Sequence, residues 1–197
     1  MTFTPTQEFD VLHGLRIKGM TKAEELATST DIDIATIQVV LDAAIEQELA
    51  RSRKGGRVEG YMLTAAGRER HATLRADNVP ARFDELTAAY DAFLAPNRAF
   101  KTLTTKWQTE ANGDSSVVQA DLDALHHSVH IVLTRAASAV PRMKTYEPRF
   151  TAALNQFRSG ETSALARPMS GSYHDVWMEL HEDLLLMLGR ERTDADE

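Results

Sequence analysis

Basic side chains gather in one short stretch, RSRKGGR at residues 51–57. It holds Arg51, Arg53, Lys54 and Arg57. Cations at this density neutralise phosphates, the main source of non-specific affinity for DNA. The preceding stretch, DIDIATIQVVLDAAIEQELA at residues 31–50, carries five carboxylates and no Lys or Arg. Any electrostatic attraction to DNA is therefore expected in residues 51–57. The alternative is that this segment is only a solvent-exposed hairpin, whose cations discourage the addition of a further strand.

Histidines and carboxylates suggest a second kind of chemistry in the carboxyl half. Their helical spacing places Asp123, His127 and His130 on one face, and His174 and His181 on another. Imidazole and carboxylate groups suit zinc or a similar ion, so these five residues form a hypothetical metal site. The alternative is that the histidines are partly buried hydrogen-bonding residues, and we expect no obligatory cofactor.

Nucleophilic catalysis is not indicated. Ser170, Ser172, His174 and Asp175 are close in sequence, but adjacent helical residues point about 100° apart and do not converge as a triad does. There are no cysteines, and no phosphate-binding loop or dinucleotide fingerprint is found. We therefore predict that the protein is not an enzyme.

Aromatic and methionine side chains are concentrated in the carboxyl half. At helical spacing they usually form a core, but a cavity among them would fit a small acidic or acyl effector. We expect such an effector to contact five residues, which are Arg149, Tyr173, His174, Trp177 and His181.

Composition restricts the class of protein. The chain of 197 residues is 43% hydrophobic and has a formal net charge of -7, which argues against a general nucleic-acid coat. The amino terminus has no basic, apolar leader, and no apolar run approaches the ~20 residues that span a bilayer. We expect a cytoplasmic protein with no membrane partner.

Periodicity predicts three helices in the first 50 residues. The first covers residues 7–18, and Thr21 to Glu24 have the form of a capping box for the second, which runs to about Thr28. Asp33 is a good N-cap for the third, whose buried stripe is expected at Ile37, Leu41 and Ile45.

A β-hairpin and a fourth helix are expected next. Polar and β-forming residues flank Gly55 and Gly56, which suit a tight turn, and Thr64 caps a helix that runs to about residue 77. Helix, helix, helix, hairpin, helix is the order of a winged helix. We assign residues 1–77 to a winged helix-turn-helix domain.

Residues 78–197 are expected to form an all-α domain of about five helices. Their expected bounds are 80–93, 97–109, 116–139, 145–158 and 171–189, with breaks at Pro96 and Pro141. The run LLLML at 184–188 is apolar on every side of a helix and must be buried on several faces, one of which a second subunit is able to cover. The fold class is therefore mostly α, with the hairpin as the only β element expected.

Two segments resemble known proteins. LTAAGRERHATL (residues 63–74) resembles the segment after the wing in MarR-like regulators, and residues 7–76 resemble that class, whose outline PadR and GntR regulators share. Glu48 departs from the glycine that many of these domains have before the strand. The ending SYHDVWMELHEDLL (residues 172–185) resembles that of small actinobacterial winged-helix regulators.

The resemblance implies how DNA is contacted. A winged helix reads base edges from its third helix and holds phosphates with its wing. We therefore expect DNA contacts from seven residues, which are Lys22, Thr36, Gln38, Arg51, Arg53, Lys54 and Arg57. Gln can pair with adenine, and Thr can contact a thymine methyl group.

The function expected is that of a homodimeric, one-component transcription regulator. Its partners are double-stranded DNA, a second copy of the chain and a small acidic or acyl effector. The acidic third helix supports an alternative, in which a degenerate winged helix binds a protein partner and the chain is an accessory protein that does not bind DNA.

Overall fold

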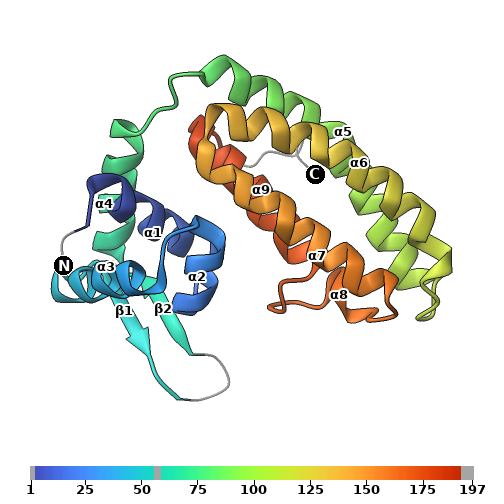
Figure 1. The fold of residues 1–197 in the computed structure, drawn as a ribbon, viewed down its shortest axis with the longest axis horizontal. Coiled ribbons are helices and arrows are strands. Elements are labelled where there is room, and N and C mark those ends of the chain that lie inside the picture. Colours follow the sequence, from blue (N-terminus) through green and yellow to red (C-terminus); the bar gives the residue numbers. More distant parts are fainter. Residues whose placement is uncertain (1–2, 56–58, 192–197) are drawn as a thin grey trace. The chain divides into compact units, whose positions relative to one another are not determined.

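The chain is mostly helical and forms two compact units, Met1–Val79 and Pro80–Glu197, in a computed structural model (Figure 1). The structure describes residues 3–55 and 59–191. A small antiparallel sheet follows the first three helices. Within the described residues, no helix combines the length and the apolar character needed to cross a bilayer.

Three helices open the first unit. Asp33 caps the third as expected, because its side chain accepts from the backbone N–H of Thr36 at 2.9 Å. The predicted capping box at Thr21 is wrong: the second helix has its N-cap at Lys22, and the backbone of Thr21 pairs with that of Tyr61 at 3.1 and 2.8 Å. The three helices are α1 (Pro5–Lys18), α2 (Ala23–Thr30) and α3 (Ile34–Glu46).

The predicted hairpin is present, but its connection is longer than a two-residue turn. Strand β1 (Ala50–Arg53) pairs with β2 (Gly60–Leu63) so that Arg53 lies opposite Gly60. Part of the connection, including Gly56, lies outside the described residues. Helix α4 (Ala65–Asp77) then begins after its cap Thr64, whose hydroxyl accepts from the backbone N–H of Gly67 at 3.0 Å.

Close backbone approaches fix the hairpin to the helices. Gly60 has a φ of 146°, and a Cβ there would lie 2.4 Å from the carbonyl oxygen of Thr21. A Cβ on Gly67 would lie 1.9 Å from the carbonyl oxygen of Leu49, so only glycine fits between α4 and the segment before β1. Glu48 has a φ of 58°, the left-handed conformation for which glycine is preferred at this turn.

The core of the first unit lies between its four helices, with Leu26 of α2 fully buried. The stripe expected on α3 is correct at Ile37 and Leu41, but Ile45 is 37% exposed. A buried histidine pair, which sequence analysis did not identify, joins α1 to α4: the His13 Nδ1 lies 2.8 Å from the His71 Nε2. One of these two nitrogens must donate a proton to the hydrogen bond, and the other must accept it and therefore carries no proton.

The second unit begins with one long helix where two were predicted. Helix α5 (Phe83–Thr109) continues through Pro96, so the predicted break there is wrong. Proline removes one intrahelical hydrogen bond, but the helix is held on both sides of it by the buried side chains of Phe93 and Phe100. The buried Asn97, next to this proline, accepts at 2.9 Å from the indole N–H of Trp177.

The remaining helices pack on α5 and bury the apolar run. Helix α6 (Ser116–Ala139) lies along α5 (Figure 1) and has the predicted bounds. After it come a 3-10 helix, η1 (Pro141–Thr145), then α7 (Tyr146–Arg158), the short α8 (Ser163–Ala166), which was not predicted, and α9 (Tyr173–Leu188). Within this single chain, Leu184, Leu185 and Met187 are already buried.

Candidate functional site

The hairpin carries exposed cations. Arg51, Arg53 and Lys54 are all exposed on β1 and directly after it. Among the described residues none of the three has an ion-pair partner. Arg57 lies outside the described residues. The hairpin strands extend away from the three helices before them (Figure 1), and these cations are exposed to solvent.

The other predicted cation of this region is compensated. The ammonium group of Lys22 lies 3.3 Å from the carboxylate of Glu59, just before β2. Both side chains are about half exposed, and such a pair contributes little to stability. Lys22 can exchange this carboxylate for a phosphate at small cost. Because Glu59 partly neutralises its charge, Lys22 attracts an anion less strongly than the three hairpin cations do.

The exposed surface of α2 and α3 is acidic, which the sequence indicated for residues 31–50. Between residues 23 and 50 there are seven carboxylates and no Lys or Arg. Asp33, Asp42 and Glu46 are exposed, and hydrogen bonds from the hydroxyl and then the backbone N–H of Thr36 lower the pKa of Asp33. The amino end of α3 therefore carries a negative charge.

The two predicted base-reading side chains already have partners within the unit. The Thr36 hydroxyl donates to Asp33 at 2.7 Å. The Gln38 amide donates to Asp42 at 2.8 Å and lies 3.4 Å from the hydroxyl of Tyr61 on β2. Both side chains are partly buried. Reading a base with either one requires these hydrogen bonds to break first.

The residues predicted to bind an effector are packed as core. Tyr173 and Trp177 are fully buried, and the rings of Phe100 and Trp177 lie 4.5 Å apart between centroids. His181 is buried with its ring 5.0 Å from that of Phe93. His174 is half-buried against Phe100, at 5.8 Å between ring centroids. These side chains contact one another where a ligand was expected.

Arg149 also has an internal partner. Its guanidinium donates to Glu179 at 2.5 Å and lies over the ring of Tyr146 at 5.3 Å. A cation held this way between α7 and α9 contributes to packing. It is not presented to an acidic ligand.

The proposed metal ligands are dispersed. Asp123 accepts from Arg158 at 2.8 Å, His130 lies 3.5 Å from the carboxylate of Glu147, and His127 is exposed on its own. In the described ranges no three His, Cys, Asp or Glu side chains are arranged to hold a metal ion. His126, outside the predicted set, is the α6 histidine that reaches the core, at 3.4 Å from the Tyr173 hydroxyl. Burial and then the charge of Arg158 lower the pKa of His126.

A buried network of charged and polar side chains lies in the carboxyl-terminal half of α9. The fully buried carboxylate of Asp183 accepts two hydrogen bonds from Arg142 at 2.6 Å and one from the Tyr146 hydroxyl at 2.9 Å. Burial, and then the charge of Asp183, raises the pKa of Tyr146 well above its ordinary value. Sequence reasoning missed this network because Asp183 lies 41 residues from Arg142 and 37 from Tyr146.

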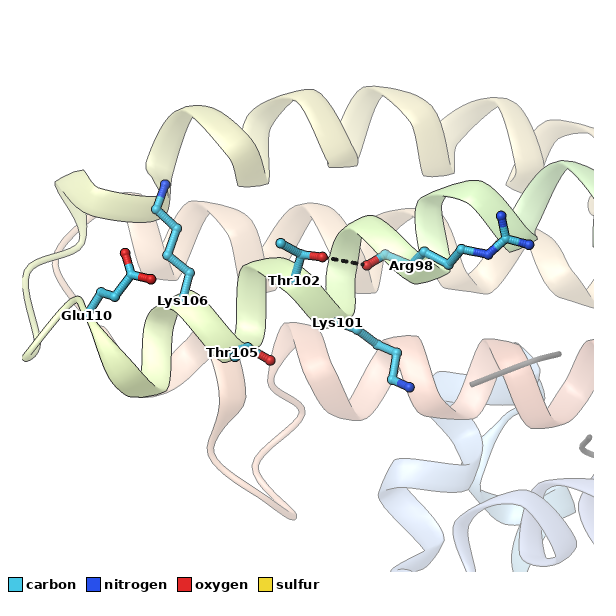
Figure 2. Close-up of a pocket in the computed structure, with 6 residues that line it drawn as sticks. All are labelled: Arg98, Lys101, Thr102, Thr105, Lys106 and Glu110. Carbon is cyan, nitrogen blue, oxygen red and sulfur yellow. Dashed lines mark hydrogen bonds between the residues drawn. The ribbon is translucent and has the colours of Figure 1, made fainter. Parts of the chain in front are cut away.

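A shallow depression of about 620 Å³ lies along the outer side of α5. Figure 2 shows its lining, in which Lys101 and Lys106 leave the helix in opposite directions. Lys106 pairs with Asp121 of α6 at 2.9 Å. The remaining lining residues are Arg98, Thr102, Thr105 and Glu110. This surface is basic although the chain as a whole is acidic.

Comparisons with protein-family models, with curated proteins and with solved structures found no match.

Proposed function

We propose that the chain is a DNA-binding transcription regulator whose first unit works as a winged helix and whose hairpin is the wing. The observation that supports this most is the set of exposed cations Arg51, Arg53 and Lys54, which have no ion-pair partner among the described residues. Phosphates are the ligands that best satisfy such cations at the tip of a protruding element.

The proposal divides the work between two elements. The hairpin supplies the salt-sensitive attraction to the phosphates. Base reading falls to Thr36 and Gln38 on α3, and it is weak because each first gives up an internal hydrogen bond. As a homodimer, the protein would contact two half-sites about one DNA turn (~34 Å) apart, so its operator would be an imperfect palindrome.

Affinity for duplex DNA tests the proposal. Fluorescence anisotropy at low salt compares the wild-type chain with a variant in which Arg51, Arg53 and Lys54 are all changed to Ala. Loss of three phosphate contacts should weaken binding by about 100-fold. A matched variant removes the same charge from exposed positions of the second unit, at Arg135, Lys144 and Arg167, and should bind within about threefold of wild type. Equal affinities of the two variants would reject the hairpin as the DNA contact.

A second candidate function follows from the acidic face of α2 and α3. Ile34 and Ile45 are 47% and 37% exposed on α3, and they lie eleven residues apart, close to three full turns, so they share one side of the helix. Exposed apolar residues among carboxylates fit a protein partner with a basic, partly apolar surface. In this alternative the chain is an accessory protein.

Neutralising the acidic face separates the two functions. If α3 approaches DNA, the combined changes Asp42→Asn and Glu46→Gln should raise duplex affinity about threefold to tenfold, since two repulsive charges are removed. If α3 instead docks on a protein, these changes leave any duplex affinity as it was. The hairpin cations then also have no effect on the activity of the protein in the cell.

A further inference from the structure

The charges of α5 are divided between its two halves. Its first half, residues 83–96, has three carboxylates and no Lys or Arg, and its second half, residues 97–109, has three cations and no carboxylate. The carboxylates are Asp84, Glu85 and Asp91, and the cations are Arg98, Lys101 and Lys106.

Members of both halves lie on one exposed stripe. From Asp91 onward the exposed positions of this stripe recur three or four residues apart, and Asp84 lies two turns before Asp91, so all of them lie on one side of the helix. They are Asp84, Asp91, Ala95, Arg98, Thr102, Thr105 and Thr109. The stripe passes through the depression shown in Figure 2, where Lys101 and Lys106 flank it.

Helix-dipole stabilisation accounts for only part of this pattern. Carboxylates in the first turn and cations in the last turn stabilise any helix, but the effect is confined to those turns. It explains Asp84, Glu85 and Lys106. Asp91 and Arg98 lie in the middle turns of the helix, where the dipole effect does not stabilise a charge.

Asp91 and Arg98 also lack compensating charges within residues 3–55 and 59–191. They are two turns apart, about 10.5 Å along the axis, and neither has an opposite charge three or four residues away on α5. Across the described part of the chain, neither forms an ion pair. Each is therefore an exposed, unpaired charge on the same stripe.

We propose that two copies of the chain associate through α5, packed antiparallel about a two-fold axis near Leu94 and Ala95. In this arrangement Asp91 of each copy faces Arg98 of the other, and the acidic half of each helix faces the basic half of its neighbour. The two-fold axis makes the contact self-complementary. The small side chain of Ala95 lets the helices approach closely at the centre, and Thr102 of one copy lies opposite Thr87 and Ala88 of the other.

This inference deepens the proposed function, since it rests on the homodimer that the regulator needs and names its contact surface. Its test uses no DNA, so the two proposals can fail separately. A chain that dimerises through α5 but binds no duplex rejects only the regulator. A monomeric chain that binds duplex through its hairpin rejects only the α5 dimer.

Charge reversal of the full-length chain is the test. Sedimentation velocity should show the wild type as a dimer at micromolar concentration. Asp91→Arg and Arg98→Asp should each weaken dimerisation by at least about 30-fold, because each replaces two attractive contacts by two repulsive ones. The double variant restores opposite charges and should dimerise within about threefold of wild type. Arg135→Asp, at an exposed position of α6, is the matched control and should leave the dimer unchanged.

Three outcomes overturn the proposal: a monomeric wild-type chain, single reversals that leave the dimer intact, or a double variant that fails to restore it. Circular dichroism confirms that each variant is folded.

Cysteine crosslinking gives the geometry directly because the chain has no native cysteine. Ala95→Cys, next to the two-fold axis, should form an intermolecular disulfide under mild oxidation. Thr109→Cys should not, since its two copies would be separated by about 40 Å along the helices. Crosslinking at position 109 in preference to 95 would reject the antiparallel pairing.

Discussion

The two units use charge in opposite ways. In the second unit, Asp183 is fully buried and bonded to Arg142 and Tyr146. In the first unit, Arg51 and Arg53 are exposed and have no ion-pair partner among the described residues. A buried, paired charge holds helices together, whereas an exposed, unpaired charge is available to another molecule. The hairpin, rather than α9 with its more conspicuous polar residues, therefore carries the charges that are available to a partner.

Histidines and aromatic residues repeat this lesson. His181 and Trp177 suggested a ligand site because of their types, but both are buried against other rings of the same unit. Their chemistry is used in packing. Residue type alone therefore does not separate a binding group from a core group, and burial decides between them.

The largest effect is expected where a buried charge loses its partner. Asp183→Asn should lower the free energy of unfolding of the second unit by about 3–5 kcal/mol, because the guanidinium of Arg142 loses the buried carboxylate that accepts two of its hydrogen bonds. Asp42→Asn, at an exposed carboxylate of α3, should change it by less than about 0.5 kcal/mol. Urea unfolding measures both, and comparable losses would contradict the distinction between the units.

Alkaline pH should destabilise the second unit by a smaller amount. Burial raises the pKa of Tyr146, and also that of Tyr173, so the folded state retains protons that the unfolded chain loses near pH 10. This stability is fully present below about pH 10 and falls above it, by up to ~1.4 kcal/mol per pH unit for each tyrosine. Trp107 and Trp177 are the only tryptophans and both lie in the second unit, so their fluorescence reports this unfolding. A midpoint independent of pH between 9 and 11 would argue against buried, protonated tyrosines.

The smallest effect is expected at the surface of α3. Gln38→Ala should reduce affinity for the preferred duplex by only about twofold to fivefold. A bidentate contact to adenine contributes about 1–3 kcal/mol, and much of this is offset by the lost hydrogen bond to Asp42. Selection from a pool of random duplexes, with the wild type and with the Gln38→Ala variant, measures the sequence preference of each protein. A loss of affinity above 100-fold would mean that Gln38 reads bases without first giving up its hydrogen bond to Asp42.

Local signals predicted much of the fold. The Asp33 cap, the bounds of α6 and the stop of α9 at Gly189, whose φ is 67°, follow from neighbouring residues. The continuation of α5 through Pro96 does not, because packing on both sides of the proline overrides its local preference. The pairing of His13 with His71 spans 58 residues, and no local pattern reports such a contact.

The candidate site was predicted unevenly for the same reason. Exposed cations in a hairpin are readable from sequence, since turns lie at the surface. The hydrogen bond from Gln38 to Asp42 was also readable, because residues four apart on a helix are neighbours. The internal partners of Arg149 and Asp183 lie on other helices and required the fold.

Salt dependence tests the central claim most directly. The slope of log affinity against log salt concentration counts the phosphates that a protein neutralises, at about 0.9 per contact. If the hairpin holds DNA, the Arg51, Arg53 and Lys54 triple alanine variant should show a slope smaller by about 3 per bound protomer than the wild type, whereas the matched variant of the second unit keeps the wild-type slope. Identical slopes for wild type and triple variant, or a wild-type chain that binds no duplex at low salt, would contradict the account.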